Sequence, residues 1–165
     1  MKLTEIEIAY LAGLFDGEGT FTISKMKSIK YPEYYFAEIF LTNSSLPIMR
    51  WLSSKIDGKI CITRYANTDK NWKDVYKFNI HAKDKMDFVT SLLPYLRIKL
   101  SQAQIVLELL NLHAAQKASK RGSGGLSDAE KDQRRELALA IRAYNKRGVE
   151  KSKDVERLSE ETLRK

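Results

Sequence analysis

The chain has very few of the residues that build disulfides or soft-metal clusters. Its 165 residues include one cysteine, Cys61, which excludes an internal disulfide and rules out a cysteine-based zinc cluster. The only two histidines, His81 and His113, lie far apart in the sequence, and neither has an acid or a cysteine at metal-ligand spacing. Both histidines are therefore expected to have ordinary structural or surface roles.

Long apolar runs are also missing. No run approaches the roughly 18 residues that a membrane span requires. The first residues, MKLTEIEIAY, contain two glutamates and alternate in polarity, which is unlike a signal peptide. On these grounds we expect a soluble intracellular protein.

Basic residues outnumber acidic ones. The sequence has 29 lysines and arginines against 21 aspartates and glutamates, which gives a net charge of +8. Such an excess favours polyanionic partners, with nucleic acid first and an anionic membrane second. A soluble basic protein without such a partner would have the same composition, so the net charge alone does not establish that the chain binds nucleic acid.

Helix and strand signals follow one another in a simple order. Thr4 and Glu7 fit a capping box, and the helix that follows is expected to end at Asp16, with Gly17 as its stop. Beyond Gly19 the apolar residues recur at every second position, which is typical of strands. The expected elements are helices at about 5–16, 47–56, 84–93, 100–118 and 127–148, and strands at about 20–25, 34–42, 59–63 and 72–80.

This order predicts an α+β domain with an αββαββα core and additional C-terminal helices. Four antiparallel strands are expected to form one sheet, with helices covering one of its faces. Residues 1–121 are assigned to the core, 122–126 to a flexible Gly-rich loop, and 127–165 to a helical extension of the same domain.

The other face of such a sheet stays open. A polar, partly basic two-stranded ribbon has the dimensions to enter a DNA major groove, although an ordinary solvated sheet face would look much the same. The residues expected to bind DNA, on this face and in its adjoining loops, are Thr22, Ser24, Lys25, Met26, Lys27, Ser28, Lys30, Tyr34, Phe36, Glu38, Lys59, Cys61, Thr63, Arg64, Lys73, Lys77 and Asn79.

The segment LAGLFDGEGTF, residues 11–21, places Asp16 and Glu18 at the negative end of a helix dipole, where acids are disfavoured. A plain turn is one explanation, because Asp and Gly favour chain reversal. A calcium loop is excluded, because the twelfth residue counted from Asp16 is Lys27 rather than Glu.

A third explanation is that two copies of this helix pack together through their small residues. The acids of both copies would then meet and repel one another unless they hold a hard cation such as Mg²⁺. The residues expected at this dimer interface are Ala9, Ala12, Gly13 and Asp16.

The stretch LAGLFDGEG resembles the defining motif of the LAGLIDADG homing endonucleases, and the order of elements agrees with that family over about residues 5–118. Only one copy of the motif is present, as in the single-motif subfamily that acts as a homodimer. The resemblance implies an intron-encoded, mobile-element enzyme that makes a staggered double-strand cut in a long, near-palindromic DNA site. It leaves the cytoplasm and an organelle of the intron host open. A non-cleaving RNA maturase or DNA-binding regulator of the same fold is the alternative.

The resemblance also implies site residues and a cofactor. Glu18 matches the metal-binding acid, usually Asp in this family, and Gly17 offers its backbone carbonyl to the metal. Asp16 matches the earlier acid of the motif, a mainly structural position that is also a candidate metal ligand. Asn43 matches a polar residue that orders water, and Lys99 a lysine that reaches the scissile phosphate. The implied cofactor is Mg²⁺, with Mn²⁺ usable and Ca²⁺ supporting binding without cleavage. Arg50 is a weak match to a further arginine and is given no role.

Overall fold

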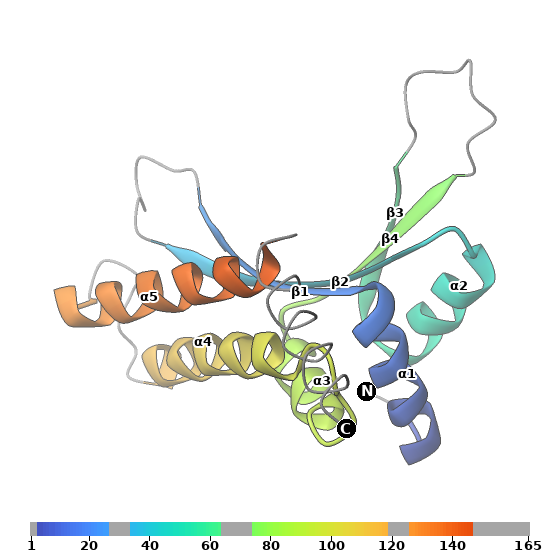
Figure 1. Ribbon diagram of the computed structural model, residues 1–165, viewed down its shortest axis with the longest axis horizontal. Helices are drawn as coiled ribbons and strands as arrows, with labels where there is room; N and C mark the ends of the chain where they lie inside the picture. Colours follow the sequence, from blue (N-terminus) through green and yellow to red (C-terminus); the bar gives the residue numbers. More distant parts are fainter. Residues whose placement is uncertain (1–2, 27–33, 64–73, 119–125, 147–165) are drawn as a thin grey trace, which may run out of the picture.

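The computed structural model describes residues 3–26, 34–63, 74–118 and 126–146 (Figure 1). The expected α+β fold and the order of its elements are confirmed. The elements are α1 (Glu5–Glu18), β1 (Gly19–Lys25), β2 (Tyr35–Asn43), α2 (Leu46–Lys55), β3 (Gly58–Thr63), β4 (Val75–Ile80), α3 (Lys85–Leu92), α4 (Leu100–Ala118) and α5 (Asp128–Asn145).

The first helix begins as expected but ends later than expected. Thr4 and Glu7 form the capping box, and the backbone N–H of Thr4 donates to the Glu7 carboxylate at 2.8 Å. Gly17 lies inside the helix, so the expected stop at that residue is wrong. The cap is instead Gly19, whose extended backbone (φ −72°, ψ 159°) leads directly into β1 while its N–H donates to the carbonyl of Phe15.

The four strands form one antiparallel sheet in the order β1-β2-β4-β3. Gly19 pairs with Leu41 at one end of the first hairpin, and Gly58 pairs with Ile80 at one end of the second. The hairpins are joined through β2 and β4, where Phe40 pairs with Asn79. The β1 and β3 strands are therefore the edges of the sheet.

The helices lie on one face of this sheet (Figure 1). Alternate strand residues face them and are buried, because a strand turns successive side chains to opposite faces. The Phe15 ring of α1 packs against Phe21 of β1 and Phe88 of α3, with ring centroids 5.6 and 5.0 Å apart. Other members of this core are Leu11, Ile23, Ala37, Ile39, Leu41, Met49, Leu52, Phe78, Ile80, Val89, Leu92, Val106 and Ile141.

The C-terminal helix α5 packs on α4 and along the edge strand β1. Its buried side chains include Leu137, Ala138 and Ile141. At its end, the side-chain amide of Asn145 donates to the carbonyl of Phe21 in β1 at 3.1 Å. The Gly-rich segment 122–125 and residues 147–165 lie outside the described residues. No helix in the described part of the chain has the length and apolar character needed to cross a bilayer.

Candidate catalytic centre and nucleic-acid interface

The Asp16 carboxylate is buried and binds the chain just before α4. It accepts hydrogen bonds from the backbone N–H groups of Arg97 at 2.8 Å, Ile98 at 3.1 Å and Lys99 at 2.9 Å. A carboxylate is well suited to this position because it satisfies N–H groups that precede a helix and have no partner within it. Both oxygens of Asp16 are thus engaged by its own chain.

Lys99 makes the return contact. Its ammonium donates to the carbonyl of Gly19 at 2.6 Å, to that of Phe15 at 3.0 Å and to that of Gly17 at 3.4 Å. These carbonyls lie at the negative end of α1, where a cation is favourable. Burial lowers the pKa of Lys99 below its ordinary value, while the negative charges of Asp16 and Glu18 act in the opposite direction.

Glu18 is the last residue of α1 and its side chain is exposed. Its carboxylate accepts a hydrogen bond from the side-chain amide of Asn43, the last residue of β2. The amide oxygen of Asn43 in turn accepts from the backbone N–H of Ser45 at 2.6 Å, immediately before α2. The fold therefore brings Glu18, Asn43 and Lys99 together around the end of α1.

The oxygen donors at this point suit a hard cation only in part. The described residues contain no group of three or more His, Cys, Asp or Glu side chains that could hold a metal ion. One chain offers the exposed Glu18 carboxylate and the carbonyl of Gly17, both of the oxygen type that Mg²⁺ and Ca²⁺ prefer. Because these ions take about six or more ligands, further oxygens have to come from a second chain, from water or from a phosphate.

One side of α1 is exposed to solvent, although the Tyr10 ring on it makes an edge contact with Trp51 of α2. The side chains of Ile6 and Tyr10 are 83% and 53% exposed. Ala9 and Gly13 are exposed beside them, and a methyl group added at Gly13 would meet nothing within 4 Å. We call this side of the helix the α1 outer face (Ile6, Ala9, Tyr10, Gly13).

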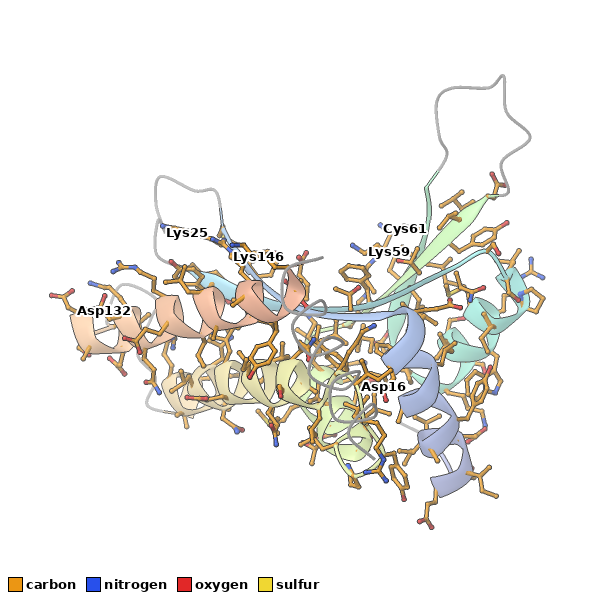
Figure 2. The ribbon with its side chains drawn as sticks, in the orientation of Figure 1. Asp16, Lys25, Lys59, Cys61, Asp132 and Lys146 are labelled. Carbon is orange, nitrogen blue, oxygen red and sulfur yellow. The ribbon has the colours of Figure 1, made fainter. Side chains whose placement is uncertain are left out.

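The open face of the sheet carries the alternate strand residues that point away from the helices. In register, Thr22 lies opposite Glu38, Ser24 opposite Phe36, Lys59 opposite Asn79, and Cys61 opposite Lys77. Figure 2 shows Lys59 and Cys61 on this side of the sheet and Asp16 on the helix side. Thr20, Phe40 and Thr42 share the open face through their pairings. Sequence reasoning missed these three, although the alternation that placed Phe36 and Glu38 extends to them.

Several open-face side chains contact one another. The Ser24 hydroxyl donates to Oε2 of Glu38 at 2.5 Å. The Lys77 ammonium lies 3.5 Å from the centroid of the Phe40 ring, which is a cation–π contact. The side-chain amide of Asn79 donates to Sγ of Cys61 at 3.8 Å.

The family model described as "LAGLIDADG endonuclease" matches residues 11–103, which is more than half of the chain. The chain belongs to the LAGLIDADG endonuclease family. Among solved structures of this fold, I-CvuI in complex with its target matches with a TM-score of 0.61 at 19% identity, covering 88% of this chain and 85% of that one. The archaeal intron-encoded I-Vdi141I, complexed with DNA, matches with a TM-score of 0.67 at 14% identity, covering 88% and 87%.

A third LAGLIDADG structure, I-SmaMI bound to an uncleaved DNA target, matches with a TM-score of 0.61 at 18% identity. That match covers 85% of this chain and 45% of the other. At these identities the likeness concerns the fold. A comparison with curated proteins found no significant match.

The structure of this LAGLIDADG chain differs from expectation at the dimer-interface residues. Ala9 and Gly13 lie on the α1 outer face, but Ala12 is fully buried and Asp16 faces the start of α4. The reason is helical geometry: Ala12 lies about 60° from Ala9 around the helix, on the side that meets the core. Sequence reasoning missed Ile6 and Tyr10, which complete the outer face.

Some expected DNA-binding residues are also placed elsewhere. Tyr34 stacks on the ring of His113 in α4, with centroids 5.6 Å apart and planes 8° apart, so it belongs to the helix layer rather than the open face. Lys25 shares the register position of Tyr35, and its ammonium lies 5.7 Å from the centroid of that ring. Met26 is 38% exposed at the end of β1. Lys27, Ser28, Lys30, Arg64 and Lys73 lie outside the described residues, as does the side chain of Thr63.

Proposed function

We propose that this chain is a homodimeric, site-specific DNA endonuclease that needs a divalent metal ion, with Mg²⁺ as its cofactor. The observation that carries the proposal is the exposed Glu18 carboxylate at the end of α1, the helix that carries the α1 outer face and leads directly into β1. Buried acids at a helix end are explained by structure, as Asp16 shows. An exposed acid at the negative pole of a helix calls for a cation.

Each side chain of the site has a distinct task in this proposal. Glu18 and the carbonyl of Gly17 hold the ion, which supplies positive charge to the phosphodiester that is cut. Asn43 holds the Glu18 carboxylate in one orientation. Lys99 keeps a fixed positive charge at the same helix end, where it stabilises the negative charge that develops on the phosphate.

A second copy of the chain completes the site. The α1 outer face carries two large exposed apolar side chains, Ile6 and Tyr10, beside the small residues Ala9 and Gly13. Small residues let two helix backbones approach closely, and burial of Ile6 and Tyr10 favours the association. Two such helices side by side bring both Glu18 residues to one place, which fits a cut in each DNA strand.

The DNA partner is supported by the open face and by the charge of the chain. Lys59, Lys77 and Asn79 lie on the open face of the β3–β4 hairpin, a two-stranded ribbon of the kind that the major groove admits, and the net charge is +8. I-CvuI and I-Vdi141I, which share the fold, are seen in complex with DNA. I-Vdi141I is intron-encoded, and we extend to this chain an origin in a mobile intron and a place inside the host cell, in the cytoplasm or an organelle.

The deciding experiment incubates the protein with DNA that spans the candidate intron-insertion sequence. Cleavage of both strands is expected with Mg²⁺ or Mn²⁺, and binding without cleavage is expected with Ca²⁺ or after EDTA. The Glu18→Gln variant is expected to bind the same DNA without cutting it, whereas Glu136→Gln, an exposed acid on α5, is expected to cut normally.

Each alternative gives a different result. Specific binding without cleavage under any metal condition would identify a non-cleaving DNA-binding member of the fold. Preference for folded RNA over DNA would identify a maturase. Full cutting by Glu18→Gln would remove Glu18 from the site, and a monomeric mass in solution by light scattering would contradict the dimer.

A further inference from the structure

Glu38 is an acid on the open face of the sheet, which is the face proposed to bind DNA and where basic or neutral residues are expected. It is the only carboxylate in the four described strands, and it lies on the open face opposite Thr22. Facing DNA, a carboxylate is repelled by every phosphate, so Glu38 cannot serve as a backbone contact. A surface built only for phosphate binding would carry lysine or a neutral residue here.

The side chain is held in one orientation. The hydroxyl of Ser24, on the neighbouring strand, donates to Oε2 of Glu38, which leaves Oε1 available as an acceptor. Phe36 and Phe40 precede and follow Glu38 on the same face of β2. Neither ring offers a hydrogen bond, and within the described residues no group donates to Oε1 of Glu38, so this oxygen can accept from a ligand or from water.

Two of the described lysines, one on each side of the sheet, are engaged by other groups. Lys77 on the open face places its ammonium over the Phe40 ring. Lys85, on the helix side of the sheet, donates to the carbonyl of Ala37 at 2.6 Å and attracts Glu38 at longer range. Within the described residues Glu38 forms no ion pair, and the charge of Lys85 acts on it only at longer range.

The major-groove edges of the bases differ in what they offer such a group. Guanine presents two acceptors, thymine an acceptor and a methyl group, and adenine a donor beside an acceptor. Cytosine alone presents an amino donor with no acceptor of its own, and a carboxylate only accepts. We infer that Glu38, oriented by Ser24, reads a base and selects cytosine at one position of each half-site. This inference rests on the proposed function, because it requires a specific DNA target.

The test is a selection of bound DNA from a fully randomised duplex library in Ca²⁺, with the full chain. The unchanged protein is expected to enrich a symmetric consensus with cytosine at one pair of related positions. Glu38→Gln is expected to lose that preference by roughly five- to tenfold, the lower part of the range for a base contact, and to shift it to adenine, whose edge an amide matches. All other positions should stay the same.

Two further variants make the result specific. Ser24→Ala removes only the orienting hydroxyl and is expected to weaken the cytosine preference by about half as much on a logarithmic scale, without a shift to adenine. Glu136→Gln makes the same change of charge on the exposed surface of α5, away from the sheet, and is expected to leave the consensus unchanged. Thermal melting shows that each variant is folded before it enters the selection.

The outcomes separate the two proposals. If the unchanged protein enriches no sequence, the proposed function is contradicted and the reading role of Glu38 falls with it. If it enriches a consensus that Glu38→Gln reproduces at every position, the proposed function stands and the base-reading role is overturned. Tighter binding of Glu38→Gln to all DNA with that same consensus would mean that Glu38 only repels phosphates.

Discussion

Asp16 near the end of α1 and Lys99 just before α4 each bind the backbone of the helix end where the other residue lies. The Asp16 carboxylate near the end of α1 binds three backbone N–H groups before α4, and the Lys99 ammonium before α4 binds three carbonyls at the end of α1. This exchange ties two distant segments together beneath the proposed catalytic acid, Glu18. Asp16 is thus unfavourably placed for the dipole of α1 but favourably placed for α4, because it lies at the positive end of that helix.

The first prediction concerns the stability supplied by Asp16. Asp16→Ala removes three part-buried hydrogen bonds to a charged group, so we expect the free energy of unfolding to fall by about 3 kcal/mol. Asp16→Asn keeps one acceptor oxygen and is expected to lose about half as much. Urea denaturation measures both.

The control for Asp16 is Asp132→Ala on the exposed surface of α5, where Asp132 pairs with Arg135 at 2.8 Å (Figure 2). An exposed pair of this kind contributes about 0.5 kcal/mol or less. Equal effects of Asp16→Ala and Asp132→Ala would show that the three hydrogen bonds of Asp16 contribute nothing to stability.

The second prediction separates structure from catalysis at Lys99 and Glu18. Lys99→Met removes the cation from the end of α1 and is expected to lower the free energy of unfolding by about 1–2 kcal/mol as well as the cleavage rate. Glu18→Gln, at an exposed position, is expected to lose cleavage with a change in stability of less than about 0.5 kcal/mol.

Lys59→Met is the matched control for Lys99→Met, because Lys59 is exposed on the open face. It should leave stability unchanged while it weakens DNA binding and reduces its dependence on salt. Loss of cleavage in Lys99→Met with unchanged stability would assign the lysine to the phosphate alone and contradict its capping role.

The third prediction concerns Gly13 in α1. Gly13→Ala adds a methyl group in open space within a helix, so the isolated chain should gain about 1 kcal/mol of stability. The same methyl group would stand between two α1 helices in the dimer and is expected to weaken association by about tenfold or more. Analytical ultracentrifugation over a dilution series measures the second effect, and an unchanged dimer would place the interface elsewhere.

Gly19→Ala is the contrasting change. A methyl group there would lie 2.7 Å from the Cα of Phe15, which is backbone and cannot move aside. We expect a loss of about 1–3 kcal/mol, from overpacking and with no gain in helix propensity. Gly13→Ala and Gly19→Ala are therefore expected to change the stability of the chain in opposite directions, and thermal melting distinguishes them.

The fourth prediction concerns pH. Burial lowers the pKa of His113 below its ordinary value, the positive charges of Arg134 and Lys85 lower it further, and a hydrogen bond to the backbone of Tyr35 opposes them. Between that lowered pKa and the unfolded value of about 6.5 the unfolded chain binds more protons. Stability should therefore fall as the pH drops below about 6.5, by at most about 1.4 kcal/mol per pH unit.

The variant that tests this is His113→Phe, which keeps a ring to stack on Tyr34 and cannot take up a proton. Its melting temperature should depend less on pH between about 6.5 and 5. His81→Gln removes the exposed imidazole that contacts Asp57 and should still lose stability on acidification. Parallel pH profiles of the unchanged protein and His113→Phe would contradict the assignment to His113.

Local patterns were enough to predict the strands and most helices. The alternation of Phe21 and Ile23 with polar residues predicted β1 and its buried side, because a strand repeats every two residues wherever it lies. The capping box at Thr4 likewise depends only on two residues three positions apart, and it is present. The candidate site residues Glu18, Asn43 and Lys99 were found from the resemblance to a motif and its order of elements.

Long-range contacts accounted for what local patterns missed. Gly17 carries a helix-stop signal, yet the helix continues because Lys99, 82 positions later, binds its carbonyl and stabilises the last turn. Tyr34 has the spacing of an open-face residue, yet stacking on His113 draws it into the helix layer.

The sequence by itself thus determines the secondary structure and the motif, because both depend on residues a few positions apart. Which groups bind each acid is decided by the tertiary structure, because those groups come from distant parts of the chain. Asp16 and Glu18 are two residues apart and chemically alike, and nothing in their spacing tells which is structural. Packing turns Asp16 inward, where the backbone N–H groups before α4 bind its charge, and leaves Glu18 exposed at the surface.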